Sequence, residues 1–164
     1  MAIRSKDQDF AITRPLFLKA SHKPDFSDGV ERESQIAYIA AEIKTNLDKT
    51  MFQEAAATAN DLRLAVPNAR YFLLCEWLDM TPITTSVTAI EKVIILRKAK
   101  RTGANIRSAF ATAGGRRAAR EDYIARLRAH PFSVDSFTHF LDEIAGTLGA
   151  SDEEEDVVLG RGWF

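Results

Sequence analysis

Apolar residues gather in four short runs along the chain. The runs occupy residues 15–20, 35–45, 71–78 and 93–97, and we predict a strand over each. In the run 35–45, both alternating faces are largely apolar, which is typical of a central strand covered on two sides. The alanine-rich segment 48–66 has apolar positions at helical spacing and ends before Pro67, so it is predicted as a helix. The strand–helix–strand order predicts an α/β core.

Polar segments and breaks separate these elements. Residues 1–14 are polar and predicted to form a loose arm, and residues 22–29 contain turn signals. The polar segment 81–89 is predicted as a loop. Beyond residue 101 the pattern becomes helical, with helices predicted over 104–113, 116–128 and 134–148 and a break at Gly114-Gly115.

The length of 164 residues suits one domain with a short tail. We expect a single domain over residues 1–150, with its core at about 15–101, a helical basic segment at 102–150 and an acidic tail at 151–164. The single cysteine, Cys75, excludes an internal disulfide framework and a multi-cysteine zinc site. Neither a secretory leader nor a membrane-length apolar run is evident, so we expect a cytoplasmic protein.

The formal net charge of −1 hides a strong segregation of charge. Residues 97–128 carry 10 basic and 2 acidic side chains, a sum of +8, whereas residues 129–164 carry 1 basic and 8 acidic, a sum of −7. A block of this kind can attract nucleic acid even in a nearly neutral chain. The charge pattern therefore leaves a DNA partner open.

One spacing of charged residues suggests chemistry. Glu42 and Lys44 lie two apart in a predicted strand, so their side chains leave the same face. A second carboxylate, Asp25, lies 17 positions before Glu42, in a segment that can return beside it as a hairpin; Asp28 is the alternative. Two carboxylates and a backbone carbonyl would form a hard oxygen site suited to Mg²⁺.

With these residues in this order, the chain resembles the PD…(D/E)xK nuclease superfamily. In that family the first Asp follows a proline, as Asp25 does here, and Glu42 and Lys44 occupy the positions of the Glu-x-Lys pair. A helix and a further core strand follow in the expected order. The resemblance implies a mixed central sheet flanked by helices, that is, an α/β restriction-endonuclease-like core.

The stretch from Lys23 to Arg101, which includes EIKTNLDKTMFQEA and YFLLCEWLDM, looks more narrowly like bacterial type II restriction endonucleases. Some enzymes of that kind have two different subunits and cut asymmetric sites. Most are longer than this chain, so a full enzyme, one subunit and a fragment all stay open.

The resemblance also implies the roles of individual residues. Asp25, Glu42 and the Ile43 carbonyl would hold Mg²⁺, and Lys44 would position the water that hydrolyses a DNA phosphodiester bond. Cutting both strands of double-stranded DNA takes two active sites, which implies a homodimer or a partner subunit. Basic residues of the +8 block would contact the duplex, and the candidates are Arg97, Lys98, Lys100, Arg101, Arg116 and Arg117.

Two further functions are compatible with the same pattern. A DNA repair or junction-cleaving nuclease could use the same core and the same three side chains. A protein of another class, which binds DNA on this core without cutting it, is the second alternative.

Overall fold

The computed structural model of the chain describes residues 8–149 and 155–162. It divides into two compact units, Met1–Ser133 and Val134–Phe164. The predicted domain over residues 1–150 with a tail at 151–164 stays a prediction. Of the predicted acidic tail, residues 151–154, 163 and 164 lie outside the described residues, and Glu155–Arg161 form a short helix, α6, that was not predicted.

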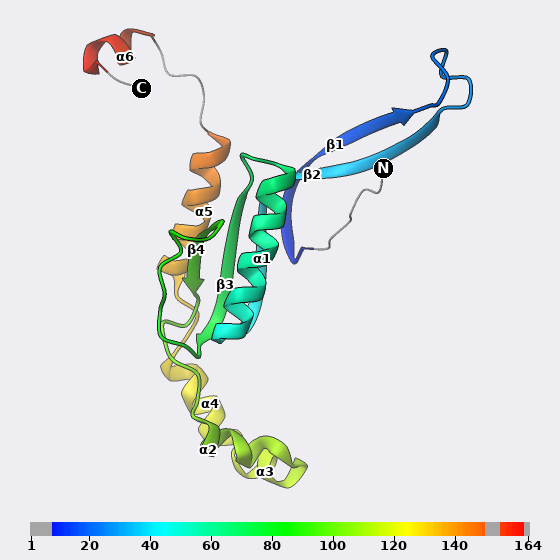
Figure 1. The fold of residues 1–164 in the computed structure, drawn as a ribbon. Coiled ribbons are helices and arrows are strands. Elements are labelled where there is room, and N and C mark those ends of the chain that lie inside the picture. The colour runs from blue at the N-terminus through cyan, green and yellow to red at the C-terminus, as the bar shows by residue number, and fades with distance from the viewer. Residues whose placement is uncertain (1–7, 150–154, 163–164) are drawn as a thin grey trace. The chain divides into compact units, whose positions relative to one another are not determined.

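The first unit is built on a four-stranded mixed sheet (Figure 1). Its strands are β1 (Phe10–Ala20), β2 (Val30–Leu47), β3 (Arg70–Leu78) and β4 (Ile90–Ile95), in the order β1-β2-β3-β4. β1 is antiparallel to β2, whereas the pairs β2–β3 and β3–β4 are parallel. The predicted α/β fold with a mixed sheet is thereby confirmed.

β1 and β2 are longer than their apolar runs indicated and continue past the ends of β3 and β4 (Figure 1). β1 begins at Phe10, so the loose arm predicted over residues 1–14 is wrong for its last residues. Pairing of β2 with β3 starts only at Ile39, so the earlier part of β2 pairs with β1 alone. We call strand residues 13–20 and 30–37, with their connecting loop, the hairpin arm. Its side chains include exposed apolar ones, such as Phe17 at 74%.

The helix α1 (Lys49–Ala65) covers one face of the sheet (Figure 1). Asp48 begins it as the N-cap, because its carboxylate accepts a hydrogen bond of 2.9 Å from the Met51 backbone N–H. The buried face of α1 consists of Phe52, Ala55 and Ala59. Two small alanines allow the helix to lie close to the sheet, where the core is continued by Leu73, Cys75 and other β3 residues.

After β4 the chain forms short helical pieces: α2 (Ala104–Arg107), a 3₁₀ turn (Ser108–Ala111), α3 (Ala113–Ala118) and α4 (Arg120–Ala129). The predicted break at Gly114-Gly115 is wrong, because both glycines lie inside α3. Gly115 is required there by close packing, since a Cβ at this position would lie 1.8 Å from the carbonyl oxygen of Ala109.

The second unit contains α5 (Val134–Leu148), as predicted, and α6. Over residues 8–149 and 155–162, the structure contains no helix with the length and apolar character needed to cross a membrane.

Replacing the N-cap residue tests how α1 is held. Asp48→Ala should lower the free energy of unfolding by about 1 kcal/mol, because one backbone N–H of the first turn loses its acceptor. Asp61→Ala, at an exposed position on the same helix, is the control and should change stability by less than about 0.5 kcal/mol. Urea denaturation of both variants measures the difference, and equal effects would contradict the capping role.

Candidate active site

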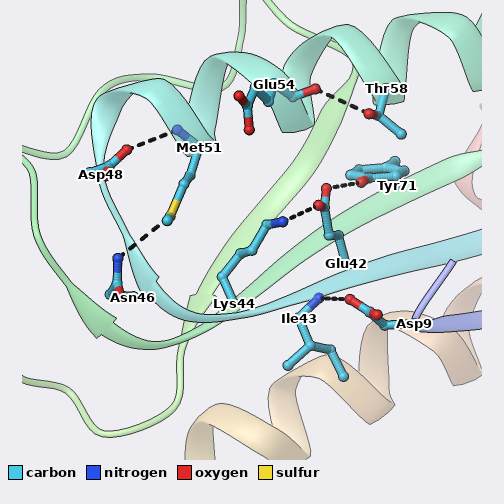
Figure 2. Close-up of polar contacts among 10 residues, drawn as sticks. All are labelled: Asp9, Glu42, Ile43, Lys44, Asn46, Asp48, Met51, Glu54, Thr58 and Tyr71. Atoms are coloured by element: carbon cyan, nitrogen blue, oxygen red, sulfur yellow. Dashed lines mark hydrogen bonds and ion pairs between the residues drawn. The ribbon is translucent and has the colours of Figure 1, made fainter.

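The structure brings Glu42 and Lys44 together on the face of β2 that α1 covers (Figure 2). Lys44 Nζ lies 2.5 Å from Glu42 Oε1, and both side chains are partly buried, 30% and 22% exposed. Their neighbour on the same face, Ala40, belongs to the core between the sheet and α1. Glu42 and Lys44 therefore form a partly buried ion pair between the sheet and α1. A fully exposed ion pair would contribute little to stability.

A third side chain, Tyr71 of β3, completes the environment of Glu42. Its hydroxyl donates a hydrogen bond of 2.7 Å to Glu42 Oε2 (Figure 2). Burial, and then the hydrogen bond and the charge of Glu42, raise the pKa of Tyr71 well above its usual value, so the hydroxyl keeps its proton and acts as a donor. Sequence reasoning missed this residue, because only the pairing of Ala40 with Tyr71 across the sheet places it there.

Further carboxylates act on Lys44. The hydrogen bond to Glu42 is the largest cause and raises the pKa of Lys44. Burial, the next in size, lowers the pKa, and the negative charges of Glu42, Asp9 and Glu54 raise it. Glu54 comes from α1, which runs over the pair in Figure 2. Lys44 is therefore a protonated ammonium group among several carboxylates.

The structure does not bring Asp25 to Glu42. Asp25 lies fully exposed in the loop at the tip of the hairpin arm, where its carboxylate accepts a hydrogen bond of 3.1 Å from the Ser27 backbone N–H. This hydrogen bond is the main reason why the pKa of Asp25 is lowered. β2 begins at Val30, so at about 3.3 Å per residue Glu42 lies roughly 40 Å further along the strand. Asp28 lies in the same loop, and its carboxylate is hydrogen-bonded to the Ser21 hydroxyl.

A different carboxylate, Asp9, lies at the site. Phe10 pairs with Ala41, so Asp9 comes next to Glu42 at the other end of the same hairpin. Its Oδ2 accepts a hydrogen bond of 2.7 Å from the Ile43 backbone N–H (Figure 2). The sequence offered one signal for it: antiparallel pairing of the strands on both sides of residues 22–29 brings the residues before the first strand beside the end of the second.

The donors at this end of the hairpin fit Mg²⁺ by their chemistry. Asp9 and Glu42 supply carboxylate oxygens, and Ile43, which lies between Glu42 and Lys44 in β2, supplies a backbone carbonyl. Mg²⁺ in proteins commonly uses one or two carboxylates and keeps several waters. In the part of the chain that the structure describes, no group of three or more His, Cys, Asp or Glu side chains could hold a metal ion. A magnesium site here would therefore depend on two carboxylates, the Ile43 carbonyl and water.

Two of the predicted DNA contacts, Arg97 and Arg101, form ion pairs with carboxylates of the same chain. Arg97 Nε lies 2.6 Å from Glu76 Oε1, its Nη1 donates to the His130 carbonyl at 2.7 Å, and its guanidinium lies 3.9 Å from the centre of the Phe132 ring. Arg101 Nη1 lies 2.9 Å from Asp79 Oδ2. Arg97, with 11% of its side chain exposed, therefore links β3, through Glu76, to the chain after α4.

The other four predicted contacts, Lys98, Lys100, Arg116 and Arg117, have exposed side chains. Lys98 has a positive φ of 48°, and Arg116 donates to the carbonyl of Phe110 at 2.9 Å. The +8 block thus contains arginines that hold the fold together and cations that face solvent.

The mixed sheet and the Glu-x-Lys pair on its second strand define the class of restriction-endonuclease-like proteins. The sequence matches the family described as Bpu10I restriction endonuclease over residues 1–164. The chain belongs to this family, which favours a restriction enzyme over the repair nuclease and the non-catalytic protein that the sequence left open.

A solved structure supports the same fold. The structure described as the native BbvCI A2B2 tetramer at low resolution is similar to this chain, with a TM-score of 0.51 and 29% sequence identity. The similarity covers 62% of this chain and 37% of the other, so the chain spans less than half the length of that relative. No curated protein matches the chain.

The contacts of Arg97 predict that this residue stabilises the fold, whether or not it contacts DNA. Arg97→Ala should lower the free energy of unfolding by about 2 kcal/mol or more, because it leaves the partly buried Glu76 carboxylate without its partner. Arg117→Ala, at an exposed position of α3, should change it by less than about 0.5 kcal/mol. Urea denaturation compares the two, and an Arg97→Ala protein as stable as the control would refute the role.

Proposed function

We propose that the chain is the catalytic part of a Mg²⁺-dependent type II restriction endonuclease that hydrolyses DNA phosphodiester bonds. The observation that carries the proposal is the partly buried Glu42–Lys44 pair, with Asp9 hydrogen-bonded to the backbone N–H of Ile43 between the two residues. Membership of a restriction endonuclease family supports the reaction class. In this proposal Asp9 takes the metal-binding role that the sequence had suggested for Asp25.

Each residue has a distinct role in this reaction. Asp9, Glu42 and the Ile43 carbonyl would hold Mg²⁺, which when bound lowers the pKa of a water and offsets negative charge on a phosphate. The Lys44 ammonium group would donate hydrogen bonds to the attacking water and stabilise the charge that builds on the phosphate oxygens. The ion pair with Glu42 supports this role, since it fixes the position of Nζ before substrate binds.

The exposed cations of the +8 block are proposed to contact the backbone of double-stranded DNA. Lys98, Lys100, Arg116 and Arg117 are the candidates, because their side chains are exposed. Phosphate contacts of this kind position a protein on the duplex without reading its sequence. Arg97 and Arg101 would support this surface from within, through Glu76 and Asp79.

We also propose that the active protein contains a second catalytic subunit, either another copy or a partner chain. One active site hydrolyses one strand, so cutting a duplex on both strands takes two sites. The similar BbvCI structure is described as an A2B2 tetramer, which supports an assembly of more than one subunit for this chain.

Lys44→Ala is the direct test of the proposed activity. Losing the ammonium group should lower the cleavage rate at least about a hundredfold, because its charge acts on the transition state. DNA binding without divalent metal should be unchanged. Plasmid cleavage in Mg²⁺ and a gel-shift assay in EDTA, both on the native assembly, measure the two properties. Normal cleavage by this variant would overturn the proposal.

A matched pair of substitutions tests which aspartate serves the site. Asp9→Asn keeps an oxygen that can accept from the Ile43 N–H but removes the charge, so cleavage and Mg²⁺ binding should both be lost. Asp25→Asn, in the exposed loop, should leave both unchanged. Plasmid cleavage across a range of Mg²⁺ concentrations distinguishes them, and the reverse pattern would restore Asp25 to the site.

A further inference from the structure

The hydroxyl of Tyr71 is a buried polar group whose contact serves the active site. Only 1% of the residue is exposed, and its ring belongs to the core under α1 with Leu73 and Cys75. A buried hydroxyl needs an acceptor, and the acceptor here is Glu42 Oε2 at 2.7 Å. The contact links a fixed part of the core to the carboxylate that is proposed to bind metal.

The parallel pairing of β2 and β3 creates this contact. Tyr71 is paired with Ala40, and Glu42 is paired with Leu73, so Tyr71 and Glu42 are diagonal neighbours on one face of the sheet. A long aromatic side chain can reach such a diagonal neighbour. Packing in the core fixes the direction of the Tyr71 side chain, and the hydrogen bond to Glu42 adds to this.

The two oxygens of Glu42 have different partners. Oε1 contacts the Lys44 ammonium group at 2.5 Å, and Oε2 accepts from the Tyr71 hydroxyl (Figure 2). A glutamate held at one oxygen can still rotate about its last side-chain bond, whose rotamers are broad. With both oxygens held, the plane of the carboxylate is fixed.

From these contacts we infer that Tyr71 is a positioning residue, which orients the Glu42 carboxylate for a divalent cation. The inference rests on the proposed function. Each carboxylate oxygen has two lone pairs, so a hydrogen bond from Tyr71 leaves one for a metal ion. Because the carboxylate is already ordered, metal binding loses less side-chain entropy. Partners that orient a metal ligand typically change metal affinity by about 10–100-fold when they are removed.

Tyr71→Phe tests the inference, because it removes the hydroxyl and keeps the buried ring. Calorimetric titration with Mg²⁺, on the native assembly without DNA, should show about tenfold weaker binding. The Mg²⁺ concentration for half-maximal plasmid cleavage should rise by a similar factor, and kcat should recover at saturating Mg²⁺. A loss of packing alone would instead lower kcat at every Mg²⁺ concentration.

Two further variants keep the test specific. Tyr38→Phe, on the same strand as Glu42 and with 37% of the residue exposed, should leave Mg²⁺ binding unchanged. Glu42→Asp shortens the side chain away from the Tyr71 hydroxyl, so adding Tyr71→Phe to it should weaken Mg²⁺ binding no further. Additive losses in the double variant would contradict the inferred contact.

The outcomes separate this inference from the proposed function. If the wild-type protein binds Mg²⁺ and cuts DNA while Tyr71→Phe does both equally well, the positioning role is wrong and the function stands. If the wild-type protein neither binds Mg²⁺ nor cuts DNA, the proposed function is overturned together with the inference.

Discussion

The placement of a carboxylate inside an apolar sheet is the constraint on which the site depends. Glu42 follows Ala40 and Ala41, both fully buried, and its neighbour across the sheet, Leu73, is fully buried too. An ionised group in such surroundings is costly unless charge and hydrogen bonds compensate for lost water. Lys44 supplies the charge and Tyr71 the hydrogen bond. The contacts that compensate for the burial of Glu42 are therefore the same contacts that order the proposed active site.

The basic segment shows a related division between structure and binding. Arg97 is held by Glu76 and the Phe132 ring, and Arg126 lies over Trp77 and donates to the Lys100 carbonyl. These arginines fix the segment after β4 against the end of β3. The formal charge of the segment therefore overstates the positive charge at its surface, because Arg97 and Arg101 are paired with carboxylates of the same chain.

Local patterns predicted much of the fold and the shared face of Glu42 and Lys44. Alternation placed Glu42 and Lys44 on one face, and helical spacing that ends before Pro67 predicted α1. The position of Asp25 could not be read correctly, because the apolar runs underestimated both strands of the hairpin. A longer hairpin moves its loop away from Glu42 and brings Asp9 in. Tyr71 was unpredictable for a different reason, since strand pairing decides its neighbour and periodicity does not.

The hairpin keeps its turn apart from the proposed metal ligands. Asp9 precedes its first strand and Glu42 lies near the end of its second. Both proposed metal ligands therefore lie at the open end of the hairpin, far from its turn. Residues added or lost in the turn would leave the spacing of Asp9 and Glu42 across the ladder intact. A change in the length of the tip would thus not move Asp9 relative to Glu42, whereas a single-residue slip of β1 against β2 would change their register at once.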